Sequence, residues 1–249
     1  NMSIYGLKQK SRSWYPKFDE VVSSLGFVEN KVDQCIYLKV SGSKFVILVL
    51  YVDDILLAAN DLSLLFNTKQ MLSKTFDMKD LGEASFVLGI QINRDRTRGL
   101  LGLSQKSYIE RVLEKFNMKD CKLGDVPVTK GDKLSKTQCP QTEIEKESMT
   151  KIPYSSVVGS LMYIQVCTRP DLAFPTSVLG RYLSNPGPDH WVAAKKVMRY
   201  LQRTKDYMLV YRRMSDLEVA GYIDSDFGEC LDDIKSTSGY ILMLAGGAI

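Results

Sequence analysis

Histidine is almost missing from this chain of 249 residues: His190 is the single one. That excludes a metal site built from several histidines and disfavours Ser-His-Asp or Cys-His catalysis. The five cysteines are odd in number and scattered, and none forms a CxxC pair. We therefore expect neither a disulfide framework nor a zinc site, and a reducing intracellular setting. If the chain catalyses a reaction, we expect carboxylates that bind a divalent metal ion to carry it out.

Other absences bear on the partners of the chain. No apolar run reaches the ~18 residues of a membrane-spanning helix, so no membrane partner is expected. A glycine-rich phosphate loop is also missing, which weakens the interpretation as a small-molecule-binding α/β protein. Neither sign of charge dominates, because the formal net charge is +4. This mildly basic balance permits binding to nucleic acid without requiring it.

The most informative stretch that is present is FVILVLYVDDILLAA, residues Phe45–Ala59. Its two short apolar runs each predict a buried strand, with Asp53 and Asp54 at the tip of the hairpin between them. Ionised carboxylates beside buried strands are costly unless something compensates them. Mg²⁺ does so with one or two carboxylates and substrate phosphates. The alternative for two adjacent aspartates alone is a solvated turn.

The remaining pattern predicts an α+β fold. The expected helices are Tyr15–Gly26, Leu62–Phe76 with Asp61 as its N-cap, Gln105–Phe116, stretches within Tyr154–Cys167 and Asp171–Leu183, and Asp189 to about Arg203. The expected strands are Cys35–Val40, Phe45–Leu50, Ile55–Ala59, Phe86–Ile92, Leu100–Leu103, Leu209–Tyr211, Leu217–Ile223 and Gly239–Leu244. The polar segment Asn117–Ile152 predicts a long surface loop. Pro175 is expected to disturb its helix at a cost of ~3 kcal/mol.

Six motifs occur in an order that resembles the polymerase region of copia-type retrotransposons. They are Ile4–Gln9 with Arg12–Tyr15, Tyr51–Asp54, Asp80–Glu83 with Phe86–Ile90, Leu103–Ile109, Thr168–Asp171 with His190–Lys195, and Asp224–Asp226 with Lys235–Tyr240. The Tyr51–Asp54 motif resembles the catalytic hairpin of reverse transcriptases. The resemblance spans nearly the whole chain.

The resemblance implies three segments of a Pol polyprotein. Residues 1–103 would form a partial reverse-transcriptase palm, an antiparallel sheet with packed helices. Residues 104–208 would form a helical thumb or connector that includes the polar loop 117–152, and residues 209–249 the truncated β start of a ribonuclease H-like domain. The chain would be an interior fragment, with the first catalytic aspartate of the family upstream of it. It would act in the cytoplasm, within a virus-like particle, or in the nucleus, and its oligomeric state stays open.

The same resemblance assigns roles at a polymerase site. Mg²⁺ or Mn²⁺ would be the cofactor, and an RNA or DNA template-primer and dNTPs the substrates. Asp53 would ligate a metal ion directly, and Asp54 would support it or bind more weakly. The neighbouring Tyr51 and Val52 would lie near the primer terminus.

Two further segments would contact the substrates. Lys8 and Gln9 would line the nucleotide pocket, where Gly6 would allow close approach of the backbone; the alternative for Lys8 and Gln9 is an exposed turn. The segment Leu88-Gly89-Ile90 would form the primer grip. The alternative is a plain core strand, and the two can hold together.

The last third of the chain offers further candidates. Asp224 would be the first metal ligand of the ribonuclease H site, whereas Asp226, Asp232 and Asp233 are expected to be solvated turn residues. His190 and Trp191 are expected to pack rather than to catalyse.

Two groups of basic residues are candidates for contact with phosphates. Lys195, Arg199 and Arg203 repeat every four residues and form one stripe on a helix. This stripe would lie along a nucleic-acid backbone, and a solvated helix face is the alternative. The three residues Arg94, Arg96 and Arg98 form the second group, with the same alternative.

The sequence thus predicts the reverse transcriptase region of a copia-type element, which transfers nucleotides by a two-metal mechanism. As an isolated fragment it is expected to be inactive. The alternative is a catalytically dead remnant whose basic surface binds nucleic acid without chemistry.

Overall fold

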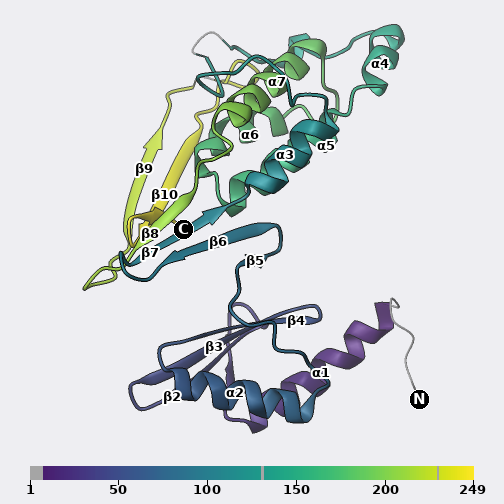
Figure 1. The fold of residues 1–249 in the computed structure, drawn as a ribbon. Coiled ribbons are helices and arrows are strands. Elements are labelled where there is room, and N and C mark those ends of the chain that lie inside the picture. The colour runs from purple at the N-terminus through teal and green to yellow at the C-terminus, as the bar shows by residue number, and fades with distance from the viewer. Residues whose placement is uncertain (1–7, 130–131, 229) are drawn as a thin grey trace. The chain divides into compact units, whose positions relative to one another are not determined.

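The computed structural model describes residues 8–129, 132–228 and 230–249, and only the backbone of residues 8–13. The chain divides into two compact units, Asn1–Ala84 and Ser85–Ile249. Each unit combines helices with antiparallel strands, so the expected α+β class is confirmed (Figure 1). The finer division at residues 103 and 208 stays a prediction.

The first unit is a four-stranded antiparallel sheet with two helices. The strands pair in chain order: β1 (Val28–Glu29), β2 (Ile36–Ser41), β3 (Lys44–Tyr51) and β4 (Asp54–Ala59). The helices are α1 (Lys8–Ser24) and α2 (Leu62–Thr75). Alternate residues of β3 are buried, as the period of a strand requires. They pack with residues of both helices in one core, which contains Phe18, Val22, Tyr37, Val46, Leu48, Leu50, Leu72 and Phe76.

Local chemistry accounts for the ends of these helices. The backbone N–H of Leu64 donates to Asp61 Oδ1 over 2.8 Å, which confirms Asp61 as the N-cap of α2. The ammonium of Lys44 also bonds this carboxylate and helps to hold its pKa below the usual range. By contrast, α1 begins at Lys8, seven residues before the predicted start at Tyr15. Pro16 is typical of a first helical turn, whereas here it lies inside the helix.

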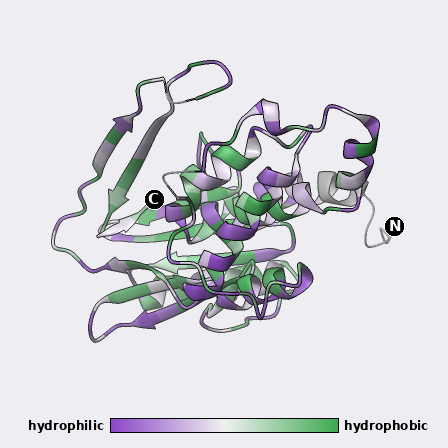
Figure 2. Ribbon diagram, turned by 90° about the horizontal axis from the view of Figure 1, so that it is seen from above, coloured by the Kyte–Doolittle hydropathy of each residue, from purple (hydrophilic) through white to green (hydrophobic). Residues whose placement is uncertain are grey.

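The second unit is built around a bundle of helices. Its helices are α3 (Lys106–Lys115), α4 (Glu143–Thr150), α5 (Tyr154–Cys167), α6 (Ala173–Gly180) and α7 (Pro188–Arg203), with 3-10 turns η1 (Lys136–Gln138) and η2 (Pro170–Leu172). Figure 2 shows both hydrophobic and hydrophilic residues on the helices of the protein. The apolar residues of α3, α5 and α7 form a second core with Leu172 and Leu179, including Ile109, Leu113, Val157, Leu161, Ile164, Met198 and Leu201.

Two antiparallel sheets complete the second unit. The first has the order β5 (Phe86–Val87), β6 (Ile90–Asp95), β7 (Leu100–Ser104) and β8 (Leu209–Arg212). The second has the order β11 (Gly247–Ala248), β10 (Ser238–Leu244) and β9 (Ala220–Ser225). The strand predicted at Leu217–Ile223 thus begins three residues later, and β11 was not predicted. Strand β8 pairs with β7 and so extends the sheet of β5–β7. The resemblance had placed β8 in the segment 209–249 and the other three strands mainly in the segment 1–103.

Two predicted elements are wrong. The strand expected at Phe86–Ile92 is a hairpin, because Val87 pairs with Ile90 and two residues turn between them. The segment expected to be a loop, Asn117–Ile152, contains η1 and α4. Helix α4 carries no apolar stripe, since Met149 is its one buried residue. A capping box starts it instead, in which Thr142 and Glu145 satisfy each other's backbone N–H groups.

Pro175 disturbs its helix less than predicted. It is the third residue of α6, which follows the N-cap Leu172. The N–H groups of the first turn have no partner inside a helix, so a proline there removes no helical hydrogen bond. The expected cost of ~3 kcal/mol applies to a helix interior and not to this position.

A buried arginine fastens η2 to the end of α7. Arg169 is 2% exposed. Its guanidinium donates to both carboxylate oxygens of Asp171, over 3.0 and 2.7 Å, and to the carbonyl and hydroxyl of Thr204, over 3.0 and 2.8 Å. Tyr200 adds its hydroxyl to Asp171, and its ring lies 5.3 Å from the guanidinium. Burial opposes ionisation of Asp171, yet the bonds from Arg169 hold its pKa below the ordinary value.

We predict that Arg169→Met lowers the free energy of unfolding by about 3 kcal/mol, because it removes the ion pair of the partly buried Asp171 carboxylate and the two bonds to Thr204. Denaturant unfolding followed by circular dichroism measures this loss. Arg181→Met is the matched control, since Arg181 is exposed and its substitution should change stability by about 0.5 kcal/mol or less. Equal losses in the two variants would contradict the role assigned to Arg169.

Candidate active site

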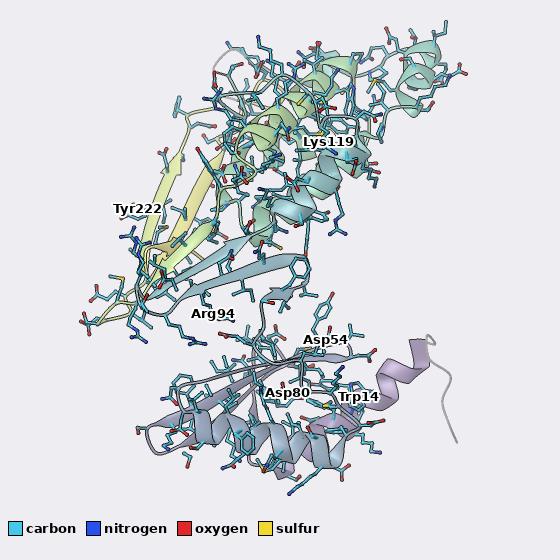
Figure 3. The ribbon with its side chains drawn as sticks, in the orientation of Figure 1. Trp14, Asp54, Asp80, Arg94, Lys119 and Tyr222 are labelled. Atoms are coloured by element: carbon cyan, nitrogen blue, oxygen red, sulfur yellow. The ribbon has the colours of Figure 1, made fainter. Side chains whose placement is uncertain are left out.

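The two adjacent aspartates lie at the tip of the β3–β4 hairpin, as predicted. Tyr51 pairs with Asp54, so Val52 and Asp53 form a two-residue turn. Figure 3 labels Asp54 at the start of β4. The register continues through Leu50 and Ile55 and along both apolar strands. The hairpin therefore presents two consecutive carboxylates on a backbone that the sheet holds in place.

Both carboxylates are exposed, which corrects one step of the sequence argument. The side chains of the two preceding residues are exposed too, Tyr51 by 52% and Val52 by 65%. Water therefore solvates Asp53 and Asp54, and desolvation by itself does not demand a metal ion there. Among the residues that the structure describes, no group of three or more histidine, cysteine, aspartate or glutamate side chains forms a metal site. The donor chemistry of two adjacent carboxylates nevertheless fits Mg²⁺ or Mn²⁺.

The turn is strained at Val52. Its φ is +53°, in the left-handed region that β-branched residues rarely adopt. Such a conformation costs on the order of 1–3 kcal/mol and persists where the surrounding structure imposes it. The pairing of Tyr51 with Asp54 imposes it here.

The predicted nucleotide-pocket residues lie at the start of the chain. Gly6 lies outside the described residues. Lys8 and Gln9 begin α1, so the alternative of an exposed turn is wrong for their backbone. Their role at a nucleotide pocket stays a prediction.

The predicted primer-grip residues form a hairpin turn between β5 and β6. Leu88 and Gly89 have φ of +51° and +78°. A two-residue hairpin with positive φ at both positions suits a glycine at the second. The alternative of a plain core strand is therefore wrong, and Leu88 is 46% exposed.

A tyrosine of α5 holds this turn. The hydroxyl of Tyr163 donates to the carbonyl of Leu88. Its ring packs edge-on against Tyr108 of α3, with centroids 5.0 Å apart. Gly89 lies close by, because a Cβ there would come within 3.8 Å of the Tyr163 hydroxyl. The turn is thus fixed by the helical bundle, a contact that the sequence did not reveal.

Asp224 lies near the end of β9, at the edge of the three-stranded sheet. It pairs with Gly239 of β10, and its Oδ1 accepts the N–H of Ser225 over 2.9 Å. Every residue of β9 is exposed. The predicted strand-end position is confirmed, and the role as a metal ligand stays a prediction.

The nearby Asp232 is not the solvated turn residue that was expected. Its carboxylate accepts the backbone N–H of Lys136 over 2.6 Å and the hydroxyl of Tyr182 over 3.1 Å. Burial and this bond raise the pKa of Tyr182. The ring of Tyr182 stacks on His190 with centroids 4.0 Å apart. Asp232 therefore ties the loop after β9 to the corner between α6 and α7.

His190 is fully buried, which confirms that it packs. Its Nδ1 accepts the N–H of Gly187 over 2.8 Å and caps the start of α7. Burial lowers its pKa, so the imidazole is neutral at pH 7. The neighbouring Trp191 is half-buried and joins the same core.

The basic stripe of α7 is partly covered by the polar segment that precedes η1. Arg203 forms an ion pair with Asp125. Arg199 accepts the N–H of Gly124 at its carbonyl over 3.1 Å, and Lys195 lies 5.8 Å from the ring of Trp191. Part of the stripe is therefore covered, so it is not a wholly solvated helix face. Its contact with the phosphates of a nucleic acid stays a prediction.

Relatives of known origin identify the family of this chain. The family model for "Reverse transcriptase (RNA-dependent DNA polymerase)" matches residues 1–130. The chain belongs to the reverse transcriptase family. This reverse transcriptase chain is 49% identical, over all of its length, to the Retrovirus-related Pol polyprotein from transposon TNT 1-94 of Nicotiana tabacum. It is 35% identical, over 97% of its length, to the Retrovirus-related Pol polyprotein from transposon RE2 of Arabidopsis thaliana.

The share of each relative that is covered differs widely. The reverse transcriptase chain spans 19% of the tobacco polyprotein and 16% of the Arabidopsis one. It is also 32% identical, over 99% of its length, to the Putative transposon Ty5-1 protein YCL074W of Saccharomyces cerevisiae, of which it covers 78%. No solved structure matches the chain. In the part of the chain that the structure describes, no helix is long and apolar enough to cross a membrane.

We predict that Val52→Gly raises the free energy of unfolding by about 1 kcal/mol. Relief of on the order of 1–3 kcal/mol of strain should exceed the roughly 0.5–1 kcal/mol that glycine loses in backbone entropy. The matched control is Val40→Gly, at a valine within β2 that is 61% exposed. Thermal unfolding should rank Val52→Gly above the wild type and Val40→Gly below it. Destabilisation of both by the same amount would show that the turn is not strained.

We predict that Tyr163→Phe loosens the Leu88–Gly89 turn. Loss of the hydroxyl leaves the Leu88 carbonyl without this donor, at a cost of about 1 kcal/mol, while the ring contact remains. Amide hydrogen exchange should rise at the turn and at Ile90. Tyr222→Phe is the control, because Tyr222 projects from β9 and is 65% exposed (Figure 3). Unchanged exchange at the turn in Tyr163→Phe would rule out the hydroxyl as its anchor.

Proposed function

We propose that this chain supplies the catalytic hairpin of an RNA-directed DNA polymerase from a copia-type retrotransposon. The observation that carries the proposal is the pair of carboxylates, Asp53 and Asp54, at the tip of an antiparallel hairpin in a chain of the reverse transcriptase family. The substrates would be a template-primer of RNA or DNA and dNTPs. The first unit would belong to the palm, and the helical bundle of the second unit to the thumb or connector.

The side chains of the hairpin would have two different roles at this site, metal binding and contact with the primer. Asp53 and Asp54 would hold Mg²⁺ or Mn²⁺ with their carboxylate oxygens, together with oxygens of the substrate. The metal ions, when bound, would stabilise charge on the attacking and leaving oxygens of nucleotidyl transfer. Tyr51 and Val52 would lie against the primer terminus, since both are exposed beside the carboxylates. The sheet would keep this group in one orientation while substrates exchange.

Other segments would position the substrates. Lys8 and Gln9, at the start of α1, would face the incoming nucleotide. The Leu88–Gly89 turn would grip the primer, and its anchor Tyr163 would keep it in place. Asp224 at the edge of β9 would contribute to a ribonuclease H site. These roles follow from the resemblance.

We predict that Asp53→Asn abolishes primer extension. Asparagine keeps the size of the side chain but removes the charge that would hold a metal ion. The assay extends a labelled primer on an RNA template with Mg²⁺ or Mn²⁺. It compares this chain with a longer protein that includes flanking coding sequence, because the site needs more carboxylates than the hairpin carries.

Asp77→Asn serves as the matched control, because Asp77 is exposed in the same unit but lies beyond α2. The control should extend primers like the wild type. If the longer protein with Asp53→Asn extends primers as well as its wild type does, the assignment of the hairpin is wrong. Binding of template-primer without extension, in every protein tested, would favour the catalytically dead remnant.

A further inference from the structure

The single histidine of the chain lies where three segments of the second unit meet. His190 is fully buried at the start of α7, and the ring of Tyr182 stacks on it. Gly187, the N-cap of α7, lies so close to η1 that a Cβ there would clash with the carbonyl oxygen of Gln138. The loop after β9 reaches the same corner through Asp232, whose carboxylate accepts the Tyr182 hydroxyl over 3.1 Å.

One nitrogen of the imidazole makes the contact that starts α7. Nδ1 of His190 accepts the N–H of Gly187 over 2.8 Å. Only a ring nitrogen without a proton can accept, so the proton of the neutral ring is on Nε2. His190 is the third residue after the N-cap, the place that glutamate or glutamine takes in a capping box. Unlike glutamine, histidine can gain a proton near neutral pH, and here it would gain it on Nδ1.

The surroundings of the ring favour its neutral form. Burial lowers the pKa of His190, and it outweighs the backbone of Ser135 and the carboxylates of Asp189 and Asp232, which favour the cation. The other titratable groups of this corner neighbour Tyr182 or Asp232. They are Lys136, Cys139, Tyr154, Arg181 and Cys230. A proton on His190 therefore has to enter a site in which burial opposes its charge.

The same corner is one of two attachments of the β9–β11 sheet to the rest of the second unit. Asp232 accepts the N–H of Lys136 over 2.6 Å in addition to the hydroxyl of Tyr182. Arg181 donates to the hydroxyl of Thr237 over 2.9 Å. We call the group of Lys136, Tyr182, His190 and Asp232 the corner latch, because it joins η1, the end of α6, the start of α7 and the loop after β9.

The second attachment of the sheet is at β8. The N–H of Arg212 donates to the carbonyl of Ala245 over 2.8 Å, and the hydroxyl of Tyr211 donates to the carbonyl of Ala248 over 2.7 Å. Its donors are a backbone amide and a tyrosine hydroxyl, and neither of them titrates between pH 5 and 8. Acid in this range therefore acts on the corner latch and spares the attachment at β8.

We propose that the corner latch is a pH-sensitive device, in which a proton on Nδ1 of His190 opens the latch while the β9–β11 sheet stays attached at β8. The proton comes from solvent and takes the lone pair that accepts the Gly187 N–H, so two donors then face each other. The charged ring can no longer stay buried against Tyr182, and the bond of Tyr182 to Asp232 is lost with it.

The direction of the pH dependence follows from linkage. The open form binds the proton more tightly than the closed form, because water solvates the ring in the open form. The latch is therefore closed above about pH 6.5 and opens progressively as the pH falls. The proposal uses neither the hairpin carboxylates nor a metal ion, so it is independent of the proposed polymerase function.

The test combines an NMR titration with amide hydrogen exchange on the untagged chain. His190 is the single histidine, so its imidazole signals need no further assignment, and they should titrate below pH 6.5. The amides of Gly187 and Lys136 report on the latch, because their acceptors are His190 and Asp232. Exchange is expressed as protection relative to the intrinsic rate at each pH. The amide of Ile109, which donates to Gln105 over 2.9 Å in α3, is the internal control.

The size of the effect is set by the open form. With the ordinary histidine pKa of about 6.5, the equilibrium constant of opening rises by up to about tenfold at pH 5.5. The protection of Gly187 and Lys136 should therefore fall several-fold between pH 7.5 and pH 5.5. That of Ile109 should stay constant.

Two variants separate the histidine from the carboxylates around it. His190→Gln keeps an acceptor for the Gly187 N–H but does not titrate, so the protection of Gly187 should become independent of pH in this range. Tyr182→Phe keeps the stacked ring and removes the bond to Asp232. The pH response of Gly187 should then persist, and that of Lys136 should shrink. Thermal unfolding at pH 7.5 shows whether each variant is folded.

Three outcomes would overturn the proposal. One is an imidazole that titrates at about pH 6.5 or above while the protection of Gly187 and Lys136 stays constant. Another is the wild-type loss of protection in a folded His190→Gln variant, which would assign the response to Asp189 or Asp232. The third is an equal loss at Ile109, which would mean that acid unfolds the whole unit. If His190→Gln does not fold, the comparison of Gly187 with Ile109 in the wild type decides.

Discussion

The register of the β3–β4 pairing determines what this chain can present at its surface. The side chains of β3 alternate between core and exterior, so Val46, Leu48 and Leu50 all enter the core of the first unit. A slip of one residue would move these three to the outside and so is opposed by their burial. With the register fixed, Tyr51 must face Asp54 and only Val52 and Asp53 remain for the turn. The position of both carboxylates, and the strain at Val52, follow from burying three aliphatic residues elsewhere in the strand.

The parts of the fold that sequence could predict are those in which one local signal decides the outcome. The hairpin followed from two apolar runs, α2 from Asp61 as its N-cap, and α3 and α7 from their apolar spacing. Helix α4 was missed because its surroundings bury almost nothing of it, and its only signal was the capping pair at Thr142 and Glu145. The Leu88–Gly89 turn was hidden inside an apolar run, where a single glycine was the sign of a reversal.

The contacts that join distant segments could not be predicted in this way. Nothing near Tyr163 in the sequence points to the Leu88 carbonyl, and nothing near Gly99 points to the backbone of Arg213. Asp232 was assigned to solvent because aspartates between strands usually are, yet it bonds to Lys136 and Tyr182. Arg169 belonged to a recognisable motif, but its role required the end of α7 to be adjacent. Such contacts depend on tertiary placement, which a single sequence does not encode in any local pattern.

The pairing of β7 with β8 also has a consequence for synthesis of the chain. Leu103 pairs with Leu209, so the partner strand of β7 emerges from the ribosome 106 residues later. At roughly 5–20 residues per second, this strand edge waits about 5–20 s for its partner. During that time its unpaired N–H and carbonyl groups are available to any other extended chain. Helices α3 to α7 are synthesised in this interval. A short connection then leads from the end of α7 at Arg203 to β8, which begins at Leu209 and pairs with the edge of β7.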